Sequence, residues 1–181
     1  MAKNFRRCVG MMILNEQNKI LVGKRLDHPS GHWQMPQGGI DENENPETAV
    51  WREMYEEIGT NKAIIIKKSN QWINYEIPKS TLETLPWGNK YIGQTQKWFA
   101  FRFNGDETDI NVGTENPEFS EWKWSDHNLL VENIVPFKRK VYEIGSEIFS
   151  RFSLASPGAP EAQEANFNFS GAFLVIPLKI G

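Results

Sequence analysis

Residues 38–60 constrain this chain most, because they place three glutamates on one side of a predicted helix directly after a glycine-rich turn. On a helix that advances about 100° per residue, the apolar and the acidic side chains fall on separate arcs. The apolar arc holds Val50, Trp51, Met54, Tyr55 and Ile58, and the acidic arc holds Glu53, Glu56 and Glu57. We therefore expect the apolar arc to pack and the acidic arc to present carboxylates.

Three neighbouring carboxylates repel one another, and like charges at this spacing cost a helix a few tenths of a kcal/mol. Oxygen ligands suit Mg²⁺, Mn²⁺ or Ca²⁺ better than Zn²⁺, and Mg²⁺ commonly adds waters and the oxygens of a phosphate substrate. A solvated acidic face is the ordinary interpretation of such a stripe. The spacing of Gly38, Glu44, Arg52 and Gly59 around the glutamates favours a metal site that handles phosphates.

These positions resemble the Nudix box, which is a glycine, five residues, a glutamate, seven residues, and then Arg-Glu-aliphatic-x-Glu-Glu-x-Gly-aliphatic. Met54 fills the first aliphatic position, whereas Thr60 departs from the pattern at the last one. Over residues 5 to about 152, the chain is similar to the RNA pyrophosphohydrolase branch of this family. The diadenosine polyphosphate hydrolases belong to this branch or lie beside it. The segments that carry it are residues 33–40, 93–99, 116–119, 122–124 and 135–139.

The resemblance implies an enzyme that uses Mg²⁺, with Mn²⁺ as a substitute, to hydrolyse phosphoric anhydride bonds. Its implied substrate is 5'-triphosphorylated or diphosphorylated RNA, which it would convert to 5'-monophosphorylated RNA and so promote mRNA decay. The alternative is a diadenosine polyphosphate hydrolase. Neither DNA nor a membrane is expected as a partner, and protein partners are unknown.

The resemblance also implies roles for individual residues. The expected metal ligands are Gly38, through its carbonyl, and Glu53, Glu56, Glu57 and Glu118. One of the four glutamates would be the general base, and the sequence does not choose among them. Arg52 is a permanent cation and so is assigned to orient Glu44 or Glu56. The expected substrate-binding residues are Arg6, Arg25, Val135, Phe137 and Lys138.

The order of predicted elements favours an α/β class fold, a mixed β-sheet covered on both faces as an α/β/α sandwich. Strands are predicted at residues 8–14 and 19–25, joined as a hairpin, and at 33–35, 64–66, 72–75, 96–103 and 121–124. Helices are predicted from Pro46 to near Gly59 and, with an interruption at Pro136, over residues 133–149. The resemblance implies this same fold.

With 181 residues and 39% hydrophobic content, the chain is sized for one domain, which we place at residues 1–152. Residues 153–181 have a linker-like composition followed by a short apolar segment, and their role is unknown. The single Cys8 fits a reducing compartment, and no segment resembles a signal peptide or a membrane span. We therefore expect a cytoplasmic protein.

Two hypotheses from other functional classes stay open at this point. The chain could be a Nudix-fold protein that binds RNA or nucleotides without catalysis, although its predicted metal-binding glutamates are all present. It could also be an interaction protein that acts through residues 153–181. Loss of Mg²⁺-dependent hydrolysis would indicate the first, and deletion of those residues would expose the second.

Overall fold

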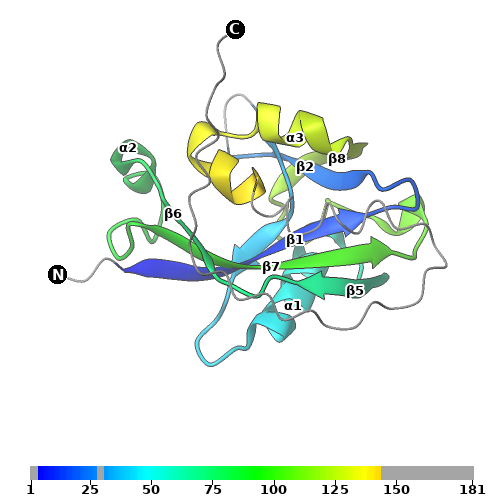
Figure 1. Ribbon diagram of the computed structural model, residues 1–181, viewed down its shortest axis with the longest axis horizontal. Helices are drawn as coiled ribbons and strands as arrows, with labels where there is room; N and C mark the ends of the chain where they lie inside the picture. The colour runs from blue at the N-terminus through cyan, green and yellow to red at the C-terminus, as the bar shows by residue number, and fades with distance from the viewer. Residues whose placement is uncertain (1–3, 28–30, 144–181) are drawn as a thin grey trace, which may run out of the picture.

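A computed structural model describes residues 4–27 and 31–143. Within them one mixed sheet of eight strands forms the centre of the molecule (Figure 1). The strands are β1 (Phe5–Leu14), β2 (Ile20–Arg25), β3 (Trp33–Gln34), β4 (Gln37–Gly39), β5 (Ala63–Lys68), β6 (Ile73–Glu76), β7 (Gly93–Phe103) and β8 (Phe119–Ser125). The helices are α1 (Pro46–Ile58), α2 (Lys79–Leu82) and α3 (His127–Asn133), with short 3₁₀ turns η1 (Glu107–Asp109) and η2 (Pro136–Lys138).

The two long strands, β1 and β7, run parallel through the middle of the sheet, in a register that pairs Phe5 with Gly93 and Leu14 with Arg102. The other pairs are antiparallel, in the order β3-β2-β1-β7-β5, with β4 beside β1, β6 beside β7 and β8 beside β2. The predicted hairpin between β1 and β2 is present. Asn15 closes it by accepting hydrogen bonds from the N–H groups of Gln17 and Lys19.

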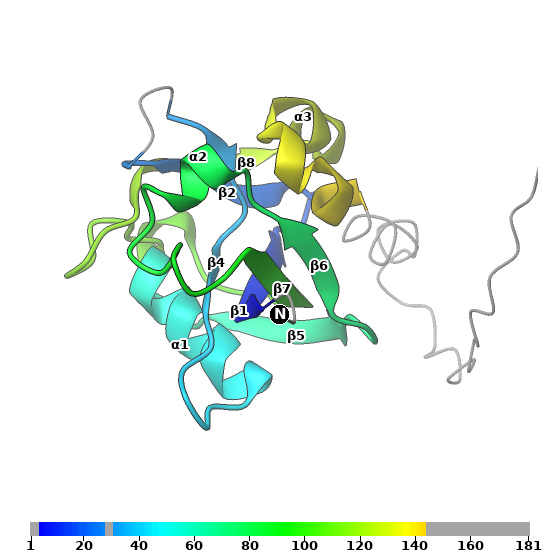
Figure 2. The ribbon, with the colours of Figure 1, turned by 90° about the vertical axis from the view of Figure 1, so that its left-hand side faces the viewer.

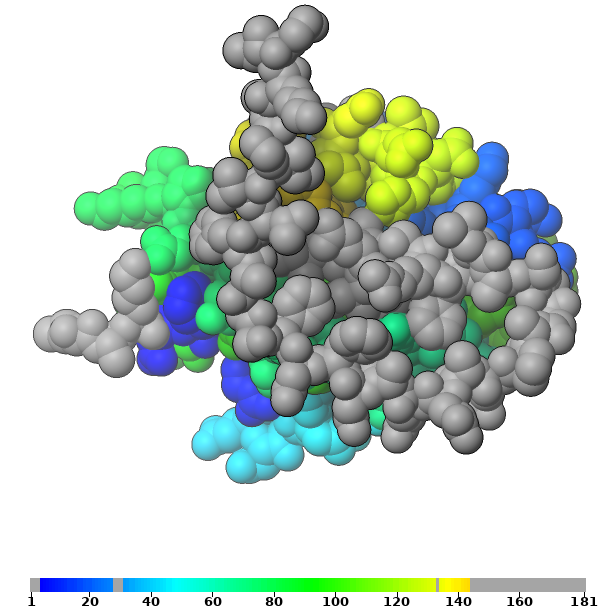
Figure 3. Space-filling view, in the orientation of Figure 1, coloured from blue at the N-terminus to red at the C-terminus, as the bar shows by residue number. Residues whose placement is uncertain are grey.

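The core has two halves because alternate residues of a strand point to opposite faces of the sheet. On β1, Met11 and Ile13 face α1, whereas Met12 and Leu14 face the C-terminal helical segment. Figure 2 shows α1 below the sheet and α3 above it, and in Figure 3 the same two helices border the molecule from opposite sides. This α/β/α sandwich with a mixed sheet confirms the predicted fold class.

Three details differ from the sequence predictions. Tyr55 was assigned to the packing arc of α1 but is 60% exposed, because the helix meets the sheet through a narrower stripe centred on Val50, Met54 and Ile58. The helical segment predicted over residues 133–149 begins earlier, as α3, and its predicted interruption at Pro136 is present as η2. Residues 144–149 of this prediction lie outside the described residues. The prediction missed α2, which is only four residues long.

The predicted domain boundary at residue 152 and the tail at 153–181 lie outside the described residues. Among the described residues, none of the helices is both long and apolar enough to cross a membrane.

Candidate active site

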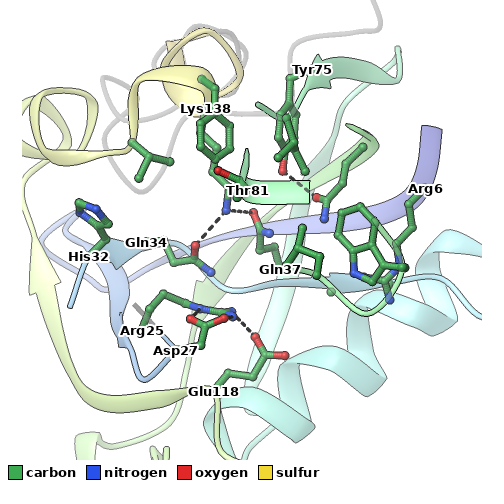
Figure 4. Close-up of a pocket in the computed structure, with 18 of the residues that line it drawn as sticks. Arg6, Arg25, Asp27, His32, Gln34, Gln37, Tyr75, Thr81, Glu118 and Lys138 are labelled. Carbon is green, nitrogen blue, oxygen red and sulfur yellow. Dashed lines mark hydrogen bonds and ion pairs between the residues drawn. The ribbon is translucent and has the colours of Figure 1, made fainter. Parts of the chain in front are cut away.

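A cavity of about 440 Å³ lies between α1, the sheet and the η2 segment (Figure 4). It brings together side chains that are as many as 132 residues apart in the chain, from Arg6 to Lys138. The predicted site residues that line it are Arg6, Arg25, Gly38, Glu53, Glu56, Glu118, Val135, Phe137 and Lys138. The individual roles of these residues remain predictions, but their shared location is a property of the fold.

Helix α1 sets the position of the glutamates through its two ends. Asn45 caps the first turn by accepting hydrogen bonds from the N–H groups of Glu47 and Thr48. Gly59 ends the helix with φ 74°, a left-handed conformation that suits glycine. Helix α1 packs beside β4 and carries Glu53 and Glu57, and both side chains are buried.

Glu53 lies directly against the backbone of Gly38. A Cβ atom added at Gly38 would be only 1.8 Å from the carboxyl carbon of Glu53. Only glycine leaves room for this contact. Burial raises the pKa of Glu53 to about 7, against the hydrogen bond from Arg52, which lowers it.

Arg52 connects the helix to the glycine turn and to three carboxylates. Its guanidinium donates two hydrogen bonds to Glu44, at 3.0 and 2.7 Å, and one each to Glu53 (2.9 Å) and Glu56 (3.1 Å). It also donates to the carbonyl oxygen of Gly39 at 2.9 Å. The predicted pairing with Glu44 or Glu56 is therefore present with both, and this fixed geometry suits a positioning residue.

Glu57 is the most deeply buried carboxylate of the group, with 2% of its surface exposed. Its Oε2 accepts a hydrogen bond from the Gln37 N–H at 2.9 Å, whereas its Oε1 is buried without a hydrogen-bond partner among the described residues. Burial, followed by the charges of Glu118 and Glu53, holds the pKa of Glu57 well above its usual range. An unpartnered buried carboxylate oxygen is costly unless a cation or a donor completes it.

Glu118 reaches the cavity from the residue before β8 and forms an ion pair with Arg25. Arg25 also binds both oxygens of Asp27, at 2.8 and 2.5 Å. The two carboxylates hold the guanidinium at the lower left of the cavity in Figure 4. Asp27 was not predicted as a site residue, although its position two residues after Arg25 in a polar loop was a usable signal.

Across residues 4–27 and 31–143, no group of three acidic, cysteine or histidine side chains is arranged as a preformed metal site. Instead, Glu53 and Glu56 form ion pairs with Arg52, and Glu118 forms an ion pair with Arg25. The donor set nevertheless fits a hard divalent ion, because all its atoms are oxygens and the buried Oε1 of Glu57 needs a positive partner. The metal-binding role of Glu53, Glu56, Glu57 and Glu118 therefore stays a prediction.

Polar side chains form the floor of the cavity. Lys138 is a predicted substrate-binding residue, whereas Gln34 and Gln37 were not predicted as site residues. Lys138 donates to the Oε1 atoms of Gln34 (3.0 Å) and Gln37 (3.4 Å), and Gln96 donates to Gln37 at 3.2 Å. An ammonium group has no acceptor. The Lys138 ammonium therefore bonds the oxygen of each glutamine amide and fixes the amide's orientation. The Gln34 Nε2 is left buried, without a hydrogen-bond partner among the described residues.

Phe137 and Val135 form the apolar side of the cavity. The Phe137 ring stacks on Tyr75, with centroids 6.2 Å apart and planes at 26°. The Tyr75 hydroxyl donates to Gln94 at 2.7 Å, so the ring is held in place. Polar and apolar walls thus meet beside the carboxylates, as a nucleotide with a phosphate chain would require.

Comparison with known proteins places the chain in a family. The NUDIX domain matches residues 4–143. A protein of Rhodospirillum rubrum named RNA pyrophosphohydrolase is 48% identical over 153 residues, which is 84% of this chain and 92% of that protein. One of the same name from Rickettsia prowazekii is 50% identical over 139 residues, covering 77% of this chain and 86% of that protein.

Solved structures share the fold at low sequence identity. The dihydroneopterin triphosphate pyrophosphohydrolase of E. coli has a TM-score of 0.62 at 19% identity, covering 78% of this chain and 97% of that one. The Ap4A hydrolase of C. elegans, in a binary complex, has a TM-score of 0.58 at 21% identity, covering 81% and 96%. These structures show the shared fold, and the domain match and the sequence relatives establish that the chain belongs to the Nudix hydrolase family.

Proposed function

We propose that this Nudix hydrolase is an RNA pyrophosphohydrolase. In the reaction, water attacks phosphorus at the 5'-triphosphate end of RNA, one phosphoric anhydride bond breaks, and 5'-monophosphorylated RNA and pyrophosphate leave. The observation that carries the proposal is the cavity whose lining joins the carboxylates of Glu53, Glu56 and Glu118 with three cationic side chains and an apolar cleft. The relatives that bear this name are matched over most of their length, which supports the same activity here.

Glu53, Glu56, Glu57 and Glu118, with the carbonyl of Gly38, would hold Mg²⁺, and Mn²⁺ is the expected substitute. When bound, the ion supplies charge neutralisation at the phosphate oxygens and activation of the attacking water. Arg52 keeps Glu53 in place through its hydrogen bonds. The general base remains one of Glu53, Glu56, Glu57 and Glu118.

The cationic side chains bind the rest of the substrate. Arg6, Arg25 and Lys138 line the cavity. Their shared location supports the proposal that they contact phosphate oxygens. Val135 and Phe137 offer an apolar surface on which a base near the RNA end can stack. The proposed substrates are 5'-triphosphorylated and diphosphorylated RNA, and the proposed location is the cytoplasm.

A parallel assay tests RNA against diadenosine tetraphosphate at equal concentration. The unmodified enzyme should prefer RNA, and Phe137→Ala should weaken the use of RNA by roughly 1 to 3 kcal/mol of apparent binding. Hydrolysis of diadenosine tetraphosphate should change less, because it has no continuing RNA chain. Tyr55→Ala, which removes an exposed aromatic ring on the far side of α1, is the control and should leave both rates unchanged. Equal losses on both substrates, with no preference for RNA, would favour the dinucleoside polyphosphate alternative.

Lys138 predicts a pH dependence of RNA use. Burial, followed by the positive charge of Arg25, lowers the pKa of Lys138 from 10.5 to about 8. Deprotonation removes a positive charge from the cavity, so kcat/KM for RNA should fall as the pH rises above about 8. In a Lys138→Met variant kcat/KM should be low at neutral pH and flat across this range. A descending limb that survives in Lys138→Met would assign it to another group.

A further inference from the structure

The guanidinium of Arg6 lies in a narrow slot at one end of the cavity. On one side is the ring of Trp87, whose centroid is 5.2 Å from the Arg6 Cζ atom, within the range of a cation–π interaction. On the other side is the backbone of β4, where a Cβ atom added at Gly39 would be 2.2 Å from the Arg6 Nη2. The slot therefore fixes the plane of the guanidinium.

Arg6 differs from Arg25 and Arg52 in having no carboxylate partner within the described parts of the chain. Arg25 is paired with Asp27 and Glu118. Arg52 is paired with Glu44 and Glu53. Arg6 takes part in none of the described ion pairs. Its N–H donors therefore stay available to an anion in the cavity, at the side opposite Arg25 in Figure 4.

Trp87 is itself held in a defined place between α2 and β7. Its ring meets that of Tyr91 edge to face, with centroids 6.1 Å apart and an interplanar angle of 67°. The Trp87 carbonyl accepts a hydrogen bond from the Lys90 N–H at 3.0 Å. The Leu85 carbonyl accepts one from the Gly88 N–H, also at 3.0 Å, which closes the turn that contains Trp87. The indole is thus a fixed wall that lines the cavity and contacts the core.

We propose that Trp87 is a positioning residue that holds Arg6 as a preoriented receptor for the polyphosphate of the substrate. The inference rests on the proposed function for the identity of that anion. Without the indole, the long Arg6 side chain would sample several rotamers and lose that freedom again on binding. Trp87 should therefore act on substrate binding and leave the chemical step unaffected.

The adjacent residue of β1 supplies a matched control. Arg7 lies over the ring of Trp72 at 4.9 Å in the same kind of contact, but neither residue lines the cavity. Binding of inorganic tripolyphosphate in the presence of Mg²⁺ would be measured by calorimetry for Trp87→Leu, Trp87→Phe and Trp72→Leu. Trp87→Leu should weaken binding about ten-fold. Trp87→Phe should retain most of the affinity, and Trp72→Leu should bind as the unmodified protein does.

Kinetics and a double variant complete the test. On triphosphorylated RNA, Trp87→Leu should raise KM by a similar factor and leave kcat unchanged. Adding Trp87→Leu to Arg6→Ala should cause no further loss, because the positioned group is already gone. Independent losses in the double variant, unchanged tripolyphosphate binding in Trp87→Leu, or an equal loss in Trp72→Leu would overturn the inference. Because calorimetry needs no turnover, absence of RNA hydrolysis by the unmodified enzyme would contradict the proposed function alone.

Discussion

Replacing Glu57 with Gln is expected to lower kcat for RNA hydrolysis by more than about 100-fold, since even residues that only support metal ligands typically cost 10- to 100-fold. The change keeps the size of the side chain and its acceptor for the Gln37 N–H. It removes the negative charge that a divalent ion needs at the buried Oε1 position. The measurement is single-turnover hydrolysis of triphosphorylated RNA at saturating Mg²⁺. Near-normal turnover would show that Glu57 is not a ligand.

The same variant should be more stable than the unmodified protein when metal is absent. Burial is the main cause that raises the pKa of Glu57 above its usual range. Burial is also the main cause that raises the pKa of Glu53 from 4.5 to about 7. Groups with raised folded-state pKa values stabilise the protein below their unfolded values and lose this contribution as the pH rises through the folded ones. With EDTA, thermal stability should therefore fall between about pH 4.5 and 7, and less steeply in Glu57→Gln.

Addition of Mg²⁺ should make the unmodified protein more stable than Glu57→Gln. Mg²⁺ binds the folded state and so should raise the melting temperature of the unmodified protein. The increase should be much smaller in Glu57→Gln. Equal increases in both proteins would place the ion away from Glu57.

Replacing Gly38 with Ala should reduce kcat about 100-fold, because a displacement of about 1 Å at a catalytic group can cost that much. The added methyl group would lie 1.8 Å from the carboxyl carbon of Glu53, so the carboxylate must move. The backbone of Gly38 does not have a positive φ angle, so alanine adds no conformational strain of its own.

Gly113→Ala is the control for this change. Its added Cβ would meet only the Asn111 side-chain oxygen, at 3.2 Å, in a segment away from the cavity. Its activity should match that of the unmodified protein. If Gly38→Ala is fully active, the contact between Gly38 and Glu53 has no part in catalysis.

Much of the fold was predictable because its signals are local. Runs of apolar residues mark β1 and β7, and Pro46 and Gly59 mark the two ends of α1. The short α2 carries neither a cap signal nor an apolar period, so it was missed. Tyr55 was assigned to the core because a helical arc gives no information on how widely the sheet contacts the helix.

The site was predicted less completely, since contacts across the sheet leave no local pattern. Glu53 and Glu57 were identified by spacing, but their burial depends on β4 passing beside α1. Gln34 gains importance only through Lys138, which lies 104 residues further along the chain. Asp27 lies two residues after Arg25, so its pairing was open to prediction and was missed. Trp87 lies outside every segment that carries the family resemblance, and only the folded chain places it against Arg6.

The most direct test of the account is one reaction of purified enzyme with 5'-triphosphorylated RNA in which the RNA 5' end and the released phosphate are both identified. The account predicts 5'-monophosphorylated RNA together with pyrophosphate, formed only when both Mg²⁺ and Glu57 are present. RNA that stays triphosphorylated, or product that forms equally well in Glu57→Gln or in EDTA, would contradict it.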